Sequence, residues 1–389
     1  MLPPDPYLTD QLIPYIGNKR KLLPMIQSAI EATGLEGGTF CDLFAGSGVV
    51  SRLAKQMGFR VIANDWEPYC EVTNLAYIES SGPPPFAKLG GMEAAFETLN
   101  SLPPVRGYVA THYCPEDDEH PDIERERMFY TQENGQRIDA IREQIESWRK
   151  AGAIGWIEEA VLLAPLIYQA SYCSNTSGVF KAFHRGWGGA TRTAWYRIRS
   201  RLTLSPPVMF DNGQDNRVLR EDASELARRV ECDIAYVDPP YNQHQYGSNY
   251  HLLNTIALWD KPRVSRHITP GGGPRTKSAI RLDWRTLRRS PYCYTATALP
   301  AFSELVARIR ARFVLVSYST DGIMPVEALL DVLAERGRLS LLTTRYKRYR
   351  VSSQRPSHRP HTVEFVAIVD RSARPRPGDG RRAAQTIGK

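Results

Sequence analysis

A strand, a glycine turn, a helix and a second strand follow one another near the N-terminus, and this order constrains the fold most strongly. Residues 40–43 form an apolar run, Gly46 and Gly48 follow, and residues 49–57 have a helical pattern. The next apolar run covers residues 61–63. Strands that alternate with helices in this way predict a parallel sheet with helices packed on its faces.

The glycine turn is suited to binding a nucleoside. Gly46 and Gly48 allow the backbone to approach a ligand closely. Asp65, about 20 residues beyond the turn, ends the second strand, where an acid can accept hydrogen bonds from a ribose diol. The turn lacks the third glycine of a pyrophosphate-binding loop, and no lysine follows it as in a P-loop. A nucleoside without phosphates, such as S-adenosylmethionine, therefore fits best.

A second motif, Asp238-Pro239-Pro240-Tyr241, closes the apolar run at residues 234–237. The prolines fix φ and remove two backbone donors, so the turn is rigid and its carbonyls remain free to accept hydrogen bonds. A carboxylate and a carbonyl can accept both protons of an exocyclic amine, while the tyrosine stacks on a base swung out of its duplex. The motif therefore indicates a site that holds a flat nucleobase by its amine.

The order of three motifs resembles that of Dam-type DNA adenine-N6 methyltransferases of the α arrangement. Residues 15–23 are similar to the N-terminal cofactor motif of that family, residues 42–48 to its glycine motif and residues 238–241 to its catalytic motif. Asp222 stands just before the catalytic strand, where the family places an acid that contacts the adenine of the cofactor. The resemblance implies methyl transfer from S-adenosylmethionine to the N6 amine of a flipped-out adenine in double-stranded DNA.

The resemblance also implies the residues of the site. The cofactor-binding residues would be Tyr15, Asn18, Lys19, Asp42, Phe44, Gly46, Gly48, Asp65, Asp222 and Asp238, and the catalytic residues Asp238, Pro239, Pro240 and Tyr241. Some roles stay open. Asp42 either caps the glycine turn or orders the methionine end of the cofactor. Lys19 is either a solvated cation or lies near the cofactor carboxylate or the DNA, and Tyr15 belongs either to the core or to the cofactor site.

The remaining apolar runs complete the prediction of a Rossmann-like, mostly parallel sheet with helices on both faces. They lie at residues 313–316, 339–343 and 363–369, with helical patterns at residues 302–310 and 325–336. The catalytic domain is expected to be discontinuous, comprising residues 1–79 and 205–370.

The intervening segment, residues 80–204, is too long for a simple crossover. Helical patterns at residues 129–150 and 154–170 predict an inserted, mainly helical domain. In relatives of the α arrangement this position holds the target-recognition domain.

Basic and aromatic residues alternate between glycines at residues 175–189 of the insert. This stretch is similar to the DNA-contacting hairpin of the family, although it lacks the usual Asn-Val-Pro near its end. Cations in such a hairpin pair with phosphates, and rings contact bases or sugars. The alternative is a loop that packs its aromatic side chains into the core. The DNA-binding residues expected here are Asn175, Lys181, His184, Arg185 and Trp187.

Three further segments carry predictions. Residues 242–251 are polar and aromatic, which suits the wall of a base pocket or a lid over it. Residues 261–299 are expected to form a basic flexible loop, either solvated or in contact with phosphates through Arg275 and Lys277. Residues 371–389 are rich in Arg, Pro, Gly and Ala and predict a disordered basic tail.

Composition agrees with a DNA partner. The 389 residues include 42% hydrophobic residues and carry a formal net charge of +8, which favours a polyanion. Six cysteines without a CxxC pair indicate reduced thiols and a cytoplasmic protein. No metal site is expected, since His112, Cys114 and His120 lack a second pair of ligands. No leader or membrane span is expected either, and the protein is expected to be a monomer.

The sequence thus predicts a site-specific, S-adenosylmethionine-dependent DNA adenine methyltransferase, acting in restriction-modification or as a phage or orphan enzyme. A cognate restriction endonuclease is a further partner left open. One alternative is an RNA adenine-N6 or DNA cytosine-N4 methyltransferase, the latter having Ser more often at the position of Asp238. The other is a non-catalytic nucleic-acid-binding relative.

Overall fold

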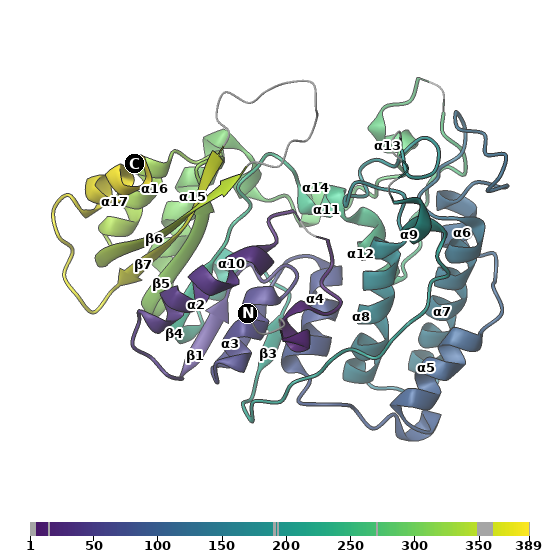
Figure 1. The fold of residues 1–389 in the computed structure, drawn as a ribbon, viewed down its shortest axis with the longest axis horizontal. Helices are drawn as coiled ribbons and strands as arrows, with labels where there is room; N and C mark the ends of the chain where they lie inside the picture. Colours follow the sequence, from purple (N-terminus) through teal and green to yellow (C-terminus); the bar gives the residue numbers. More distant parts are fainter. Residues whose placement is uncertain are drawn as a thin grey trace.

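The structure is a computed structural model that describes residues 5–14, 16–189, 192, 194–269, 271–347 and 361–388. Its centre is a seven-stranded sheet with the order β3-β2-β1-β4-β5-β7-β6 (Figure 1). The strands are β1 (Thr39–Asp42), β2 (Arg60–Asn64), β3 (Arg217–Leu219), β4 (Glu231–Val237), β5 (Arg310–Ser319), β6 (Arg338–Lys347) and β7 (His361–Asp370). The predicted apolar runs all lie in these strands, and β3 is the strand that the sequence pattern missed.

The strands β3, β2, β1, β4 and β5 are parallel to one another, and β7 runs antiparallel to both β5 and β6. The prediction of a mostly parallel α/β sheet is therefore confirmed. Parallel strands place their carboxyl ends at one edge of the sheet, where ligands bind in open α/β folds. The ends of β1, β2, β3 and β4 consequently converge on one place.

Helices cover both faces of the sheet (Figure 1). One face carries α1 (Pro6–Thr9), η1 (Lys19–Leu22), α2 (Leu23–Glu31), α3 (Val49–Gln56), α4 (Pro68–Asn74) and η2 (Leu75–Glu79). The other carries α10 (Ala223–Ala227), α15 (Thr295–Arg308), α16 (Val326–Ala334) and α17 (Asp379–Gly388). Alternate strand residues enter the two cores, as with Phe40 on the first face and Cys41 on the second.

The segment of residues 80–204 forms a mainly helical lobe beside the sheet (Figure 1). Its elements are η3 (Ala87–Leu89), α5 (Met92–Ser101), α6 (Tyr108–Tyr113), α7 (Gln132–Lys150), α8 (Trp156–Tyr172) and α9 (Trp195–Arg199). Helix α12 (His251–Leu258), which follows the catalytic motif, packs on α4 and α8. The lobe and the first face of the sheet consequently share one apolar core.

The segment of residues 261–299 was predicted to be a flexible loop, and the structure corrects this. It contains α13 (Pro274–Lys277), α14 (Trp284–Leu287) and η4 (Pro291–Cys293), after α11 (Tyr246–Asn249) and α12. Arg281 and Arg288 are buried in ion pairs with acids rather than solvated. Their charges are neutralised within the fold, so the basic composition did not indicate flexibility.

The prediction of a disordered tail at residues 371–389 is also wrong for residues 379–388, which form α17. Ala383, Ala384 and Ile387 of this helix pack with the second core, beside α16. Their spacing of one, three and four residues is the apolar stripe of a short helix, which the Arg-rich composition obscured. None of the helices in the described ranges is both long enough and apolar enough to cross a membrane.

Candidate active site and cofactor pocket

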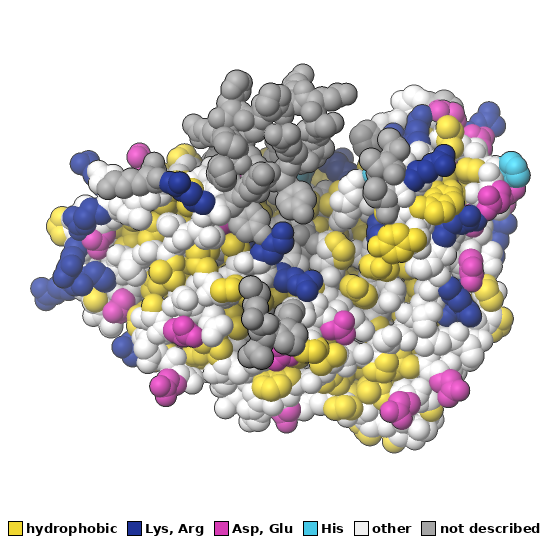
Figure 2. All heavy atoms as spheres, viewed as in Figure 1, with side chains coloured by type: hydrophobic (Ala, Val, Ile, Leu, Met, Phe, Trp, Pro, Cys, Tyr) yellow, Lys and Arg dark blue, Asp and Glu magenta, His cyan; other side chains and the backbone are white. Residues whose placement is uncertain are grey.

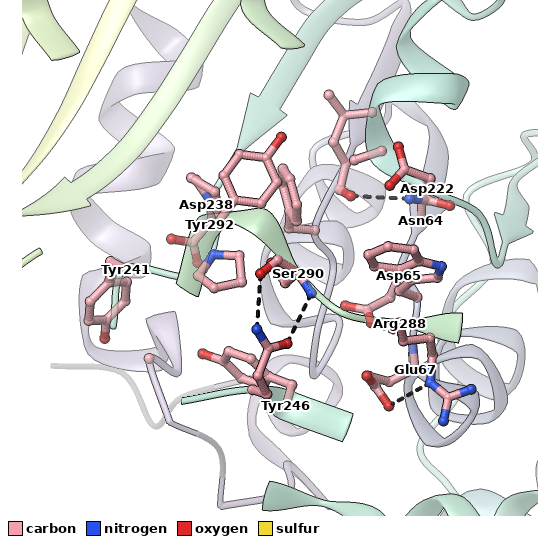
Figure 3. A pocket seen from close by; sticks show the side chains of 18 of the residues that line it. Asn64, Asp65, Glu67, Asp222, Asp238, Tyr241, Tyr246, Arg288, Ser290 and Tyr292 are labelled. Carbon is pink, nitrogen blue, oxygen red and sulfur yellow. Dashed lines mark hydrogen bonds and ion pairs between the residues drawn. The ribbon is translucent and has the colours of Figure 1, made fainter. Parts of the chain in front are cut away.

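A pocket that opens to solvent lies at the carboxyl ends of β1, β2, β3 and β4. Figure 3 shows Asp238 and Tyr241 on one side of it and Asp65, Glu67 and Arg288 on the other. We call the first side the Asp238 end. The second, to which Phe44, Asp222 and Tyr292 also belong, we call the glycine-turn end.

The glycine-turn end is held by hydrogen bonds within a short stretch of sequence. Gly46 donates its N–H to Asp65 Oδ2 at 2.8 Å, and Glu67 donates its N–H to Asp65 Oδ1 at 2.9 Å. Gly48 has φ of 78°, and a Cβ there would lie 2.2 Å from Asn74 Oδ1, so only glycine fits without displacement. Burial raises the pKa of Asp65, against the effect of these N–H donors.

Asp42 lies behind the turn, not in the pocket lining. Its Oδ1 accepts a hydrogen bond from the N–H of Phe44 at 3.3 Å, and its Oδ2 accepts one from Ser51 Oγ at 2.8 Å. Burial raises the pKa of Asp42 to about 7, while the bond from Ser51 lowers it. Of the two roles left open by the sequence, this geometry favours capping of the turn.

Asp222 and Tyr292 complete this end of the pocket. Asp222 is the N-cap of α10 and accepts hydrogen bonds from the N–H groups of Ser224 and Glu225. The rings of Phe44 and Tyr292 meet edge to face with centroids 5.3 Å apart. The hydroxyl of Tyr292 is buried without a hydrogen-bond partner among the described residues. This end therefore combines flat apolar surface with polar groups at its edges.

An ion pair forms the centre of the Asp238 end. Lys19 Nζ lies 2.9 Å from Asp238 Oδ1, and the two side chains are 5% and 15% exposed. Burial raises the pKa of Asp238, and the ammonium opposes this. Burial alone would lower the pKa of Lys19, but the neighbouring carboxylates raise it, so the lysine stays charged. Lys19 is therefore not the solvated cation that one interpretation of the sequence allowed.

Tyr241 is held beside this pair. The Lys19 ammonium lies 5.1 Å from the centre of its ring, and the ring of Tyr318 meets it edge to face. Gly17 has φ of 80°, and a Cβ there would lie 3.0 Å from Tyr241 Oη. The chain after the motif forms a wall of the pocket, because the Gln245 side chain exchanges two hydrogen bonds of 2.9 Å with the backbone of Ser290.

The N-terminal motif contributes more to the Asp238 end than to the glycine turn. Asn18 caps η1 by accepting a hydrogen bond from the N–H of Arg20 at 2.7 Å, which orients the turn that carries Lys19. Ile16 and Gly17 line the pocket. Tyr15 lies outside the described residues.

Sequence reasoning missed a buried pair at the glycine-turn end. Glu67 Oε2 lies 3.4 Å from Arg288 Nε, and Asn254 donates a hydrogen bond to the same oxygen at 2.5 Å. Burial raises the pKa of Glu67 to about 7, against the effect of Arg288. Arg288 also pairs with Asp283 at 2.7 Å. Glu67 follows Asp65 by two residues, but nothing in the sequence indicated a partner 221 positions away.

The structure separates the predicted DNA-binding residues into buried and exposed groups. Asn175 is fully buried, and its Nδ2 donates to the carbonyls of Met128, His184 and Gly186. Trp187 is 8% exposed and donates its indole N–H to the carbonyl of Asp118. These two side chains shape the loop and are not presented to a ligand. This part of the prediction is corrected toward the alternative of a packed loop.

Other cations of the insert remain at its surface. Lys181 and Arg185 are exposed, and Arg185 pairs with Glu124 at 2.7 Å. His184 is half-buried, with Nε2 3.3 Å from Ser177 Oγ, and Lys277 is half-buried at the end of α13. The side chain of Arg275 lies outside the described residues. Figure 2 shows Lys and Arg side chains near the top of the insert, interspersed with Asp, Glu and apolar side chains.

Comparison with known proteins identifies the family. The family of D12 class N6 adenine-specific DNA methyltransferases matches residues 15–268. The type II methyltransferase M.NlaIII of Neisseria lactamica is 33% identical over 364 residues, covering 92% of this chain and 99% of the relative. The modification methylases StsI of Streptococcus sanguinis and LlaI of Lactococcus lactis subsp. lactis are 31% and 34% identical, and the chain covers 52% and 51% of their lengths.

These matches agree with the order of motifs and with both ends of the pocket. They decide between the predicted alternatives, in favour of adenine in DNA over an RNA base or cytosine and in favour of an enzyme over a non-catalytic relative. The chain belongs to the D12 class of N6 adenine-specific DNA methyltransferases.

Proposed function

We propose that this enzyme takes its methyl group from S-adenosylmethionine and transfers it to an adenine swung out of double-stranded DNA. The observation that carries the proposal is one continuous pocket that joins the glycine-turn end to the Asp238 end. A methyl donor held at the first end would lie next to a base held at the second. Alignment of nucleophile and methyl group is the main requirement of this reaction.

The residues of the glycine-turn end fit the nucleoside part of S-adenosylmethionine. Phe44 and Tyr292 offer apolar surface for a purine, and Asp222 lies at its edge. Asp65 and Glu67 are the acids nearest to the end of β2, where ribose hydroxyls would find acceptors. When bound, the cofactor supplies a methyl group activated by the positive charge on its sulfur.

Asp238 would receive the adenine amine. Its carboxylate and the carbonyl of Pro239 can accept the two N6 protons, and Tyr241 can stack on the ring of the base. The N6 lone pair then forms the new N–C bond as the S–C bond breaks, and the sulfur keeps the electron pair. Positive charge develops on N6 until one proton leaves, and the carboxylate stabilises that charge. Pro240 would keep the turn rigid.

DNA would reach the pocket along the insert. Lys181 is exposed and forms no ion pair with the residues that the structure describes, so it is available to a phosphate. His184, which is half-buried, and Arg185, which is exposed, follow Lys181 in the same loop. The segment of the half-buried Lys277 meets this loop, because Ser278 Oγ donates a hydrogen bond to the carbonyl of Lys181. On binding DNA, Arg185 would leave Glu124 and pair with a negatively charged phosphate of the backbone. Arg275 is proposed to contact a phosphate as well, because it stands two residues before Lys277 in the sequence.

Three wider expectations belong to this proposal. The names of the relatives support a role in restriction-modification beside a cognate endonuclease, although the same enzyme serves an orphan or phage role equally well. Both ends of the pocket come from one chain, which supports action as a monomer. All six cysteines are free, and five of them are buried, which suits the reducing cytoplasm.

The test is methyl transfer from labelled S-adenosylmethionine to unmethylated genomic DNA, with the modified base identified by mass spectrometry. We expect N6-methyladenine in duplex DNA and none in RNA of matched length. Label in cytosine or in RNA would contradict the proposal. Methyl transfer to single-stranded DNA, with none to duplex DNA, would support the adenine chemistry but contradict the flipping of a base out of the duplex.

A further inference from the structure

Glu364 lies behind the catalytic ion pair and has no part in the mechanism so far. It belongs to β7, where it stands opposite Ser319 of β5. Val366, two residues further on, packs in the core of the face that carries η1 and α2. Side chains two apart on a strand point to the same face. Glu364 therefore points to the face from which Lys19 reaches Asp238.

Part of this carboxylate is buried without a partner. Glu364 Oε2 is inaccessible to solvent and accepts no hydrogen bond from the residues that the structure describes. A buried, unpaired carboxylate oxygen is costly unless a positive charge is near. Lys19 supplies that charge: burial raises the pKa of Glu364, and the Lys19 ammonium, together with a hydrogen bond from Ser319, lowers it. Lys19 thus lies in the fields of two carboxylates and contacts one of them.

The charges of these groups matter for methyl transfer. Lys19 and Asp238 alone form a neutral pair, which does little for a positive charge developing on N6. With Glu364 ionised, the three side chains together carry one net negative charge. A fixed charge aimed at the place where charge develops is the kind of group that lowers a barrier. The ammonium has three N–H donors and can serve both carboxylates.

We propose that Glu364 is a positioning residue that shares the Lys19 ammonium with Asp238, which frees Asp238 to accept the adenine amine. The inference rests on the proposed role of Asp238. In the described state Lys19 occupies Asp238 Oδ1. When the amine enters, Lys19 moves toward Glu364 Oε2, and the cluster keeps its net negative charge.

The first test is Glu364→Gln, which keeps the shape of the side chain and removes its charge. We expect the rate constant of methyl transfer in single-turnover assays, and with it kcat, to fall about tenfold, while the steady-state KM for S-adenosylmethionine stays within about twofold. Glu79→Gln is the matched control. Glu79 is also a largely buried glutamate, but its carboxylate accepts a hydrogen bond from the N–H of Val218 on β3. This control is expected to keep full activity.

The pH profile separates an electrostatic role from a structural one. Asp238 must be ionised to accept the amine, so activity is lost as the pH falls through its pKa. The negative charge of Glu364 opposes that ionisation, so Glu364→Gln is expected to move the acid limb of kcat to lower pH. The other titratable groups that interact electrostatically with Asp238 or Glu364 are Lys19, Tyr236, Tyr241, Asp42 and Asp321. The variant leaves all of them in place.

A double variant gives an independent measure. Lys19→Gln alone leaves two carboxylates without their cation, and removing Glu364 as well relieves their repulsion. We expect Lys19→Gln/Glu364→Gln to lose less activity than the product of the two single losses. Glu364→Asp, which restores the charge, is expected to recover most of kcat even if Glu364→Gln lowers Tm.

The inference is overturned if Glu364→Gln keeps the wild-type kcat and acid limb, or if the two single losses multiply. It is equally overturned if Glu364→Asp is as slow as Glu364→Gln. A wild-type protein that does not methylate adenine in DNA would instead refute the proposed function, and the wild-type assay distinguishes the two failures.

Discussion

The two ends of the pocket are built in different ways. At the glycine-turn end, Asp42, Asp65 and the turn itself are joined by hydrogen bonds between residues 42 and 67, mostly to backbone N–H groups. At the Asp238 end, Lys19 contacts a carboxylate that lies far away in sequence. The first end depends on a local chain conformation, and the second depends on the order of strands across the sheet.

This difference has a chemical counterpart. Backbone N–H groups fix the acids of the glycine-turn end in one position, as suits a cofactor that must always bind in the same way. The Asp238 end holds a charged pair whose partners can exchange, as suits a base that enters and leaves. The two ends should therefore respond differently to the loss of a single charge.

The largest expected effect is that of Asp238→Asn, which keeps the shape of the side chain and removes its charge. The amide oxygen of Asn is a weaker acceptor for N6 than the carboxylate, and the developing positive charge loses its stabilisation, so kcat should fall by about 10³-fold. Binding of S-adenosylmethionine, measured by calorimetry, should change by less than about twofold, because the substituted group lies at the other end of the pocket.

Asp65→Asn is the matched change at the glycine-turn end. In this variant either the Gly46 N–H or the Glu67 N–H loses its acceptor oxygen on residue 65. We therefore expect the affinity for S-adenosylmethionine to fall about tenfold, with a much smaller change in kcat at saturation. If both variants altered affinity and kcat to the same extent, the division of the pocket into two ends would have no functional meaning.

A second prediction concerns Arg288, which joins the glycine-turn end to α14. Arg288→Ala leaves the buried Glu67 carboxylate without a cation, while Asp283 keeps Arg281, and breaking a buried pair costs about 3 kcal/mol of unfolding free energy. Arg285→Ala on the same helix is the control, because Arg285 is exposed over the ring of Trp284. Its effect should be within about 0.5 kcal/mol. Urea unfolding measures both, and equal effects would contradict a supporting role for the Glu67–Arg288 pair.

The sequence predicted the sheet well because its strands are apolar runs closed by motifs of fixed geometry. Short β3 (Arg217–Leu219) escaped because only two of its three residues are apolar, which is too short a run to indicate a strand. Segments judged by composition fared worst. The charges of Arg281 and Arg288 suggested solvent, yet both side chains are buried and paired with acids, and the stripe of Ala383 and Ile387 was hidden among arginines.

For the site, the sequence located side chains at the pocket where their surroundings are local, and the roles of these residues stay predictions. The residues after β1, β2 and β4 were found because a strand end fixes where a side chain lies, and Asp42 already had capping as one of its two roles. Glu67, Tyr292 and Glu364 were missed because their relevance comes from neighbours on other strands and loops. Asn175 was assigned to DNA because its loop resembles a contact hairpin, while the burial of its amide is a tertiary property.

The smallest expected effect is on stability, and it tests how closed the glycine-turn end is. Burial raises the pKa of Asp42 to about 7, whereas the ordinary value is 3.8. Between these values the folded state keeps a proton that the unfolded state releases. Stability from this group is therefore fully present below about pH 4 and declines as the pH rises toward about 7, by an amount on the order of 1–3 kcal/mol.

Asp42→Asn should remove this dependence, so the difference in unfolding free energy between wild type and variant should shrink steadily from pH 4 to pH 7. Ser51→Ala is the opposing variant: it deletes the hydrogen bond that lowers the pKa of Asp42, so its decline should have the same slope and extend to higher pH. Urea unfolding at four pH values measures all three proteins. A difference that does not vary with pH would mean that Asp42 is ionised throughout and that the turn admits water, in which case the glycine-turn end would be as open to solvent exchange as the Asp238 end.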